Sequence, residues 1–214
     1  KVGLGLLAQL SNVFYPYTSR MLKVSREVGS ISMKTGFVAG MILSIPAAIF
    51  VISYAEFIVY VMLGNQFTQS ILTIRILGTL FLIIGFSNIF GIQVLLPLGK
   101  RQVYMSAILM GFVVHLILLL LLTPWLSEVG AAMAFVTAQV VVSFSMGFVV
   151  KKLSLDLVSG SAGLKITGLA SGLGVFALMS WIMDLNSIIS IGIFCALYIS
   201  LVLALRIVDT RSWS

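Results

Sequence analysis

The stretch LLPLGKRQVY, residues 95–104, interrupts a chain that is otherwise strongly apolar. Apolar runs lie on both sides of it, at 70–96 and 103–122. Pro97 and Gly99 are typical of a helix end, because proline cannot continue a helix and glycine readily adopts the conformation that follows one. The two cations after Gly99 stay in contact with water. The stretch therefore predicts a tight hairpin at a membrane surface, joining two membrane-spanning helices.

The composition indicates an integral membrane protein. The chain has 214 residues, 60% of them hydrophobic and 9% charged, with a mean hydropathy of +1.19. A soluble domain carries about 25% charged residues, so too little polar surface is present to cover a globule. The net charge of +7 is divided into small groups between apolar runs, whereas nucleic-acid binding requires a clustered basic face. We therefore expect the lipid bilayer, and no nucleic acid, as a partner.

The length of the apolar runs predicts about seven transmembrane helices. A spanning helix needs about 20 apolar residues, and a span must satisfy its backbone hydrogen bonds internally. The alternation of polar and apolar residues that a membrane barrel requires does not occur in these runs. The expected fold class is an all-α integral membrane protein. The seven expected spans are 3–19, 36–54, 70–96, 103–122, 129–150, 166–183 and 187–205.

The apolar run 36–64 is too long for one span. As a single helix it would measure about 43 Å, against a hydrocarbon core of about 30 Å. Glu56 stands where the excess begins. We expect 36–54 to span the membrane, with a bend at Pro46, and 55–64 to form a short helix lying in the interface.

The basic residues predict the orientation of the chain. They occupy alternate loops between the expected spans, and the positive-inside rule assigns these loops to the cytoplasmic side. The N-terminus of the chain is then expected outside and the C-terminus inside. A chain that starts outside at Lys1, without an initiator Met or a signal peptide, predicts a missing N-terminal part. The residues that alternate in this way are Arg20, Lys23, Arg26 and Lys34; Lys100 and Arg101; Lys151, Lys152 and Lys165; and Arg206 and Arg211.

The sequence contains no pattern that is typical of an enzyme. Its six acidic residues are scattered, and it has one histidine and one cysteine. These provide neither metal-ligand spacing nor a glycine-rich phosphate loop. We expect a protein without enzymatic activity, cofactor or metal.

Arg75 is the most unusual charge, because it lies inside the span 70–96. Charges within the membrane often line a substrate pathway. The competing interpretation, which we favour, is that Arg75 extends outward to water or lipid headgroups. A pair with Glu56 is an alternative to simple solvation. At 100° per residue, one helix face carries Arg75, Thr79, Leu82, Phe86 and Gln93.

Other polar residues inside the spans are candidates for a polar cavity. His115 lies in the middle of FVVHLILLL and fits a proton-coupling or substrate-contact role, or a neutral side chain hydrogen-bonded to another helix. Asn12, Asn88 and Gln139 are open to the same two interpretations, a cavity or interhelical hydrogen bonds. The spacings Gly36-x-x-x-Gly40 and Gly168-x-x-x-Gly172 predict close helix packing.

Four patterns, in order, resemble a known family. They are NVFYPYTSR at 12–20, LGNQFTQS at 63–70, LLPLGKRQVY at 95–104 and EVGAAMAFVTAQ at 128–139. They resemble the polysaccharide-transporter and O-antigen flippase family of the MOP superfamily. The resemblance implies two parts: residues 1–152 would be the second lobe of such a transporter without its first helix, and residues 153–214 an additional transmembrane helix pair.

The resemblance also implies a function. Family members move an undecaprenyl-pyrophosphate-linked oligosaccharide to the outer leaflet of the bacterial inner membrane, for O-antigen or other surface polysaccharide biosynthesis. Two lobes rock against each other, so the N-terminal lobe, absent here, would be a partner. Arg75 becomes a candidate cation for the substrate, and Asn12, Asn88 and Gln139 become candidate sugar contacts. The sequence departs from the family at His115, where Asn is common, and at Gln139, where an acid is common.

Two other functions remain open. A MATE-type multidrug exporter would use an acidic or aromatic cavity for cationic drugs, and no acid lies deep in an expected span. A non-transporting membrane scaffold subunit would need no cavity.

Overall fold

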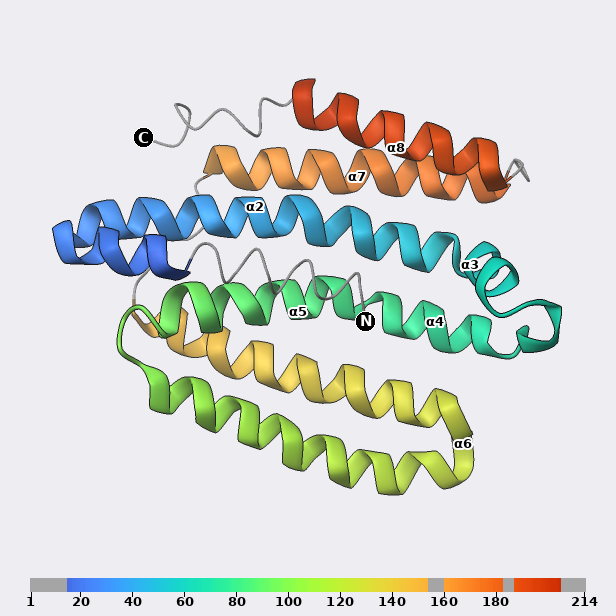
Figure 1. Ribbon diagram of the computed structural model, residues 1–214, viewed down its shortest axis with the longest axis horizontal. Helices are drawn as coiled ribbons and strands as arrows, with labels where there is room; N and C mark the ends of the chain where they lie inside the picture. The colour runs from blue at the N-terminus through green and yellow to red at the C-terminus, as the bar shows by residue number, and fades with distance from the viewer. Residues whose placement is uncertain (1–14, 154–159, 183–186, 205–214) are drawn as a thin grey trace.

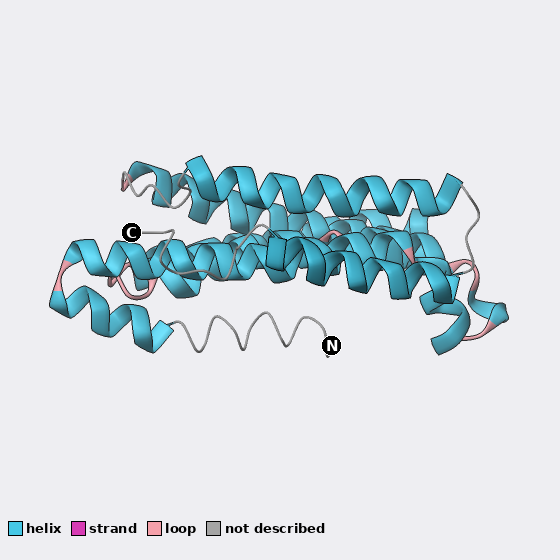
Figure 2. Cartoon of the chain, turned by 90° about the horizontal axis from the view of Figure 1, so that it is seen from above, coloured by secondary structure: helices cyan, strands magenta, loops and turns pink. Residues whose placement is uncertain are grey.

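The computed structural model describes residues 15–153, 160–182 and 187–204. These residues form helices joined by short turns, and no strand occurs among them (Figures 1 and 2). Residues 15–24 are helical and lead into the first labelled element. The elements that follow are α2 (Arg26–Ser53), α3 (Ala55–Met62), η1 (Asn65–Phe67), α4 (Ser70–Gly78), α5 (Leu80–Asn88), η2 (Ile89–Leu95), α6 (Arg101–Lys152), α7 (Gly160–Ile182) and α8 (Ser187–Ala204).

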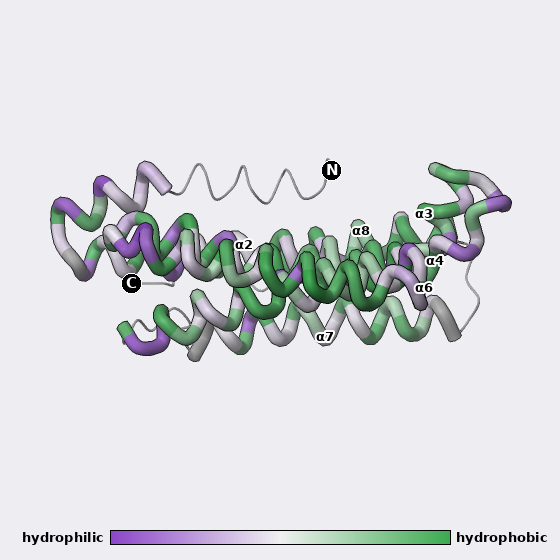
Figure 3. The backbone as a smooth tube through the Cα atoms, turned by 90° about the horizontal axis from the view of Figure 1, so that it is seen from below, coloured by the Kyte–Doolittle hydropathy of each residue, from purple (hydrophilic) through white to green (hydrophobic). Residues whose placement is uncertain are grey.

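The chain is an all-α multi-pass membrane protein, as its composition predicts. Five helical stretches among the described residues are long and apolar enough to cross a membrane. Figure 3 shows apolar residues along the middle of the bundle and hydrophilic residues concentrated towards its ends. The expected span 3–19 lies largely outside the described residues. The five stretches are Glu27–Ser53, Ser70–Leu95, Arg101–Lys152, Gly163–Ser180 and Ser187–Ala204.

Helix α6 contains two of the expected spans, because it folds back on itself. A straight helix of 52 residues would be about 78 Å long, more than twice the hydrocarbon core. The backbone leaves the helical region at Ser127, with φ 48° and ψ −127°, three residues after Pro124. Figure 1 shows two antiparallel arms, which we call the first arm (101–126) and the second arm (128–152). The loop expected between 122 and 129 is thus confirmed as a sharp turn.

The hairpin at 95–104 forms as the sequence predicts. Gly99 has φ 72°, a left-handed conformation that glycine adopts without strain. The Lys100 amide donates to the Leu95 carbonyl at 2.9 Å, and the Gly99 amide to the Leu96 carbonyl at 3.0 Å. These two bonds form a Schellman motif, which satisfies carbonyls that the end of a helix leaves without partners.

The basic segment between the first two expected spans differs from the expected loop. Residues 15–24 are helical and α2 begins at Arg26, so Ser25 alone interrupts the helical backbone. The Ser25 hydroxyl accepts a hydrogen bond from the Val28 amide at 3.1 Å and caps α2. The buried hydroxyls of Thr18 and Ser32 share a hydrogen bond of 2.8 Å between the two helices. The basic residues therefore lie on helical turns, which the Ser25 cap and the Thr18–Ser32 hydrogen bond stabilise.

The run 36–64 divides as expected. Helix α2 ends at Ser53, and α3 turns away from the bundle axis after Tyr54 (Figure 1). The Tyr54 hydroxyl lies 2.7 Å from the Ser190 hydroxyl of α8, a buried hydrogen bond that fixes the turn. Helix α2 is continuous through Pro46.

The expected span 70–96 is present but not as one regular helix. Helices α4 and α5 meet at Thr79, and the π-helical turns of η2 follow α5. Both features change the angular position of later residues, so a face calculated at 100° per residue does not extend from Arg75 to Gln93. In the structure Gln93 is 1% exposed, whereas Arg75 lies at the bundle surface with 40% of its side chain exposed.

Helix α2 is the centre of the bundle. It packs against α4, α5, η2 and α7, and α8 packs on α7. One buried cluster joins Met33, Phe37 and Met41 of α2 to residues of η2 and α6. Gly40 permits close approach of Ile89, and Gly172 of Leu201, which confirms close packing at these two glycines.

The cationic turns gather at one end of the bundle. The turn between η2 and α6, the end of the second arm and the start of α2 all lie at the left in Figure 1. Lys100 precedes the first arm, and Lys151 and Lys152 occupy the last turn of the second arm. We call the end of the bundle that carries Lys100, Lys151 and Lys152 the basic end. The turn at Ser127 and helix α3 lie at the opposite end (Figure 1).

Candidate substrate groove

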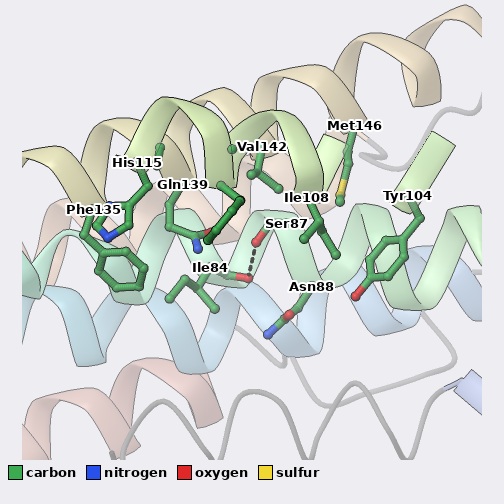
Figure 4. Close-up of a pocket in the computed structure, with 13 residues that line it drawn as sticks. Ile84, Ser87, Asn88, Tyr104, Ile108, His115, Phe135, Gln139, Val142 and Met146 are labelled. Atoms are coloured by element: carbon green, nitrogen blue, oxygen red, sulfur yellow. Dashed lines mark hydrogen bonds between the residues drawn. The ribbon is translucent and has the colours of Figure 1, made fainter. Parts of the chain in front are cut away.

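A groove of about 350 Å³ lies between α5 and the two arms of α6 (Figure 4). It brings together three candidates that are distant in sequence: Asn88 from α5, His115 from the first arm and Gln139 from the second arm. None of the residues that line it carries a formal charge. The other lining residues are Ile84, Ser87, Tyr104, Ile108, Gly111, Phe112, Phe135, Ala138, Val142 and Met146.

Helical periodicity explains which residues of the first arm reach the groove. Tyr104, Ile108, Gly111 and His115 are spaced by four, three and four residues, so they share one helix face. Gly111 permits the arms to approach: a Cβ atom there would collide with the Val142 side chain and lie 3.3 Å from the Ala138 carbonyl oxygen. The groove is therefore built on a close contact between the arms.

The polar side chains on the two sides of the groove differ in how they are bonded. The Ser87 hydroxyl donates to the Ile84 carbonyl of its own helix at 3.2 Å, so its proton is already used. Figure 4 shows the Gln139 side chain extending from α6 towards Ser87. The amides of Asn88 and Gln139 provide both donors and acceptors, which suits hydroxyl-rich ligands.

His115 was expected either to serve a cavity or to form a hydrogen bond to another helix, and the environment of its Nδ1 atom bears on this choice. This nitrogen is buried and has no hydrogen-bond partner among the described residues. The ring lies edge-on to Phe135, with 5.5 Å between ring centroids (Figure 4). A buried polar atom without a partner is costly and calls for an explanation, such as a ligand or water.

Arg75 lies apart from this groove. Its guanidinium donates to a carboxylate oxygen of Glu56 at 2.6 Å, so the pair forms where we had favoured simple solvation. With side-chain exposures of 40% and 66%, the pair contributes about 0–1 kcal/mol at most. It lines a second pocket, of about 510 Å³, with Tyr54 and Ser190. The fifth candidate, Asn12, lies outside the described residues.

Tyr104 and Phe135 belong to the groove but were not among the candidates. The sequence held a signal for both, because Tyr104 lies eleven residues before His115 and Phe135 lies four residues before Gln139, spacings that keep each pair on one helix face. Helical periodicity predicts which residues share a face on each arm, but it does not predict which face of one arm packs against which face of the other.

Comparison with known proteins gives one relevant relative. A protein of Escherichia coli (strain K12) that bears the name of a proposed O-antigen transporter is 24% identical over 142 residues. The match covers 66% of this chain and 34% of that protein, so the chain spans about a third of its relative's length. No family model matches the chain, and no solved structure matches it significantly. The likeness is to a transporter, and it agrees with the apolar helices of a multi-pass membrane protein.

Proposed function

We propose that this chain is part of a transporter that flips a lipid-linked oligosaccharide across the bacterial inner membrane for surface polysaccharide synthesis. In this proposal undecaprenyl pyrophosphate carries the glycan, and Asn88, His115 and Gln139 contact its sugar residues. The observation that carries the proposal is the groove without acidic, lysine or arginine side chains, in which these three residues line one cavity between apolar helices. The relative's name adds support for transport.

The chemistry of the groove favours a neutral, hydroxyl-rich group over a cation. The amide groups of Asn88 and Gln139 can each bond a hydroxyl, and the groove has no carboxylate to bind a cationic drug. Polar residues within membrane spans are costly, which favours a functional reason for their presence. The multidrug alternative is therefore less well supported.

The remaining parts of the proposal follow from the resemblance. Residues 1–152 would form the second lobe of the transporter and residues 153–214 an added helix pair. The N-terminal lobe of the same transporter would complete the cavity. We assign Arg75 to the surface pair with Glu56 and place it outside the proposed groove.

Deletion of the gene tests this function. Cells lacking the transporter should lose the surface glycan and accumulate the lipid-linked precursor on the cytoplasmic leaflet. Surface polysaccharide is measured by gel electrophoresis, and precursor by lipid extraction with mass spectrometry. Complementation with the intact gene is the control. If the surface glycan is unchanged and the cells become more sensitive to cationic drugs, the result favours a multidrug exporter. If membranes from the deletion strain scramble lipid at the normal rate, the result favours a scaffold subunit.

The orientation is a separate proposal, with its own test. All the cationic turns at the basic end should be cytoplasmic, because translocating Lys and Arg across the membrane is disfavoured. Single cysteines are introduced at Arg101 and Glu128 in a variant whose Cys195 is replaced by Ser. A membrane-impermeant maleimide applied to intact spheroplasts should label position 128 and spare position 101. Labelling at 101 alone would reverse the orientation.

A further inference from the structure

A second groove, almost wholly apolar, lies on another face of the same helices. We call it the aromatic groove: it has a volume of about 540 Å³ and is lined by Phe86 and Phe90 of α5 and η2 and by Phe144 and Phe148 of the second arm. Gly147 lies opposite Phe90, where a Cβ atom would be 3.2 Å from the ring. Phe144 and Phe148 are exposed, so a ligand can reach the groove from the bilayer.

The wall of the aromatic groove offers no free hydroxyl. The Ser143 hydroxyl donates to the Ile83 carbonyl at 2.9 Å and thereby bridges α6 and α5. With this bond made, the groove presents hydrocarbon and aromatic rings, a surface that suits an aliphatic chain.

The length of the groove matches one leaflet of a membrane. Its residues on the second arm extend from Val140 to Lys151, a rise of about 16 Å along the helix. Half of the hydrocarbon core is about 15 Å thick. Lys151, the charged residue of the lining, therefore lies at the level of the headgroups when the groove is filled by a chain from the same leaflet.

Lys151 is placed to bind an anion. It is in the last turn of α6 at the basic end, and it takes part in no salt bridge among the described residues. Its neighbour Lys152 has the same charge and is also exposed, but it does not line the groove. Basic side chains beside spaces between transmembrane helices bind the phosphates of lipid headgroups.

We propose that the aromatic groove is a binding site for an anionic glycerophospholipid. One acyl chain lies along Phe86, Phe90, Phe144 and Phe148, and the headgroup phosphate binds Lys151. The site is separate from the substrate groove and does not depend on the proposed transport function.

Native mass spectrometry of the purified protein tests the site. The protein is exchanged into detergent with equal amounts of phosphatidylglycerol and phosphatidylcholine, and the bound lipids are counted. The wild-type protein should retain one phosphatidylglycerol molecule in preference to phosphatidylcholine. Lys151→Ala should reduce this preference about fivefold, the factor given by about 1 kcal/mol for a single cation near a lipid headgroup. The matched control Lys152→Ala should change the preference by less than twofold.

A second variant tests the position of the acyl chain. Gly147→Leu should fill the groove and remove the retained lipid of either headgroup, while an unchanged thermal midpoint shows that the bundle remains folded. If Gly147→Leu does not fold, Phe148→Ala is tested in place of that variant. Phe148→Ala should weaken lipid retention, because it removes part of the wall of the aromatic groove.

Three outcomes overturn the proposal. Equal effects of Lys151→Ala and Lys152→Ala would mean a diffuse attraction of lipid to the basic end. Full lipid retention in Gly147→Leu would place the lipid elsewhere. Displacement of phosphatidylglycerol by an equimolar polyprenyl phosphate would assign the groove to a polyprenyl lipid instead.

Discussion

Asn88→Leu and Gln139→Leu are each expected to lower the initial rate of glycan flipping about tenfold or more. Either substitution removes an amide that faces the substrate groove, and the substrate hydroxyl it bonded would lose its partner. An unsatisfied polar group costs about 1–3 kcal/mol, and about 1.4 kcal/mol corresponds to a factor of ten. Leucine is close to asparagine in size and favourable in a membrane, so folding should be maintained. The rate is measured in proteoliposomes with the full-length protein and a lipid-linked glycan.

Arg75→Ala is the control for these variants. It removes a charge from another pocket, where the pair with Glu56 is mostly exposed. We expect transport and protein level to remain within twofold of the wild type. A loss in Arg75→Ala equal to that in Asn88→Leu would return Arg75 to the substrate path and contradict the assignment to a surface pair.

Gly111→Leu is expected to destabilise the packing between the two arms of α6. A side chain at this position has no room, because the Val142 side chain and the backbone of Ala138 already occupy the space. Overpacking of this kind costs about 1–3 kcal/mol and should force the arms apart. We expect a lower thermal midpoint of unfolding in detergent. We also expect the protein that remains folded to flip the glycan more slowly, because the shape of the groove is lost.

Gly192→Leu is the matched control for the packing prediction. Gly192 is in α8, and a Cβ atom there would meet nothing within 4 Å. Glycine has a low helix propensity, so its replacement by leucine at an exposed helix position should leave the thermal midpoint unchanged or raise it. A fall of equal size in both variants would mean that leucine at any glycine disturbs the protein, and the close contact at Gly111 would not be the cause.

The local features of this fold could be predicted from the sequence. The hairpin at 95–104 depends on Pro97 and Gly99, which act within a few residues, and it forms as expected. The split of the long apolar run near Tyr54 follows from its length against the thickness of a bilayer. Alternating cations likewise predicted that the basic loops would group at one end of the bundle. The turn before α6 and the last turn of the second arm, which carry Lys100, Lys151 and Lys152, do lie at the same end (Figure 1).

Where the sequence prediction was wrong, a tertiary contact or an irregular turn decided the structure. The face calculated from Arg75 to Gln93 assumed one regular helix, but the interruption at Thr79 and the π-helical turns of η2 change the register. The basic segment before α2 was expected as a loop, and its helical form depends on the Ser25 cap and on the bond between Thr18 and Ser32. The Arg75–Glu56 pair required knowledge of how α3 turns beside α4.

The sequence by itself determined the fold class, the spans that fall within the described residues and the ends of the bundle at which hydrophilic residues gather, because hydrophobicity and turn chemistry act over short distances. It also identified Asn88, His115 and Gln139 as unusual residues within spans. Only the tertiary structure decided that these three share a groove, while Arg75 lies elsewhere. The meeting of two helix faces depends on contacts between distant residues, such as Gly111 with Val142, and periodicity within one helix contains no information about its neighbour.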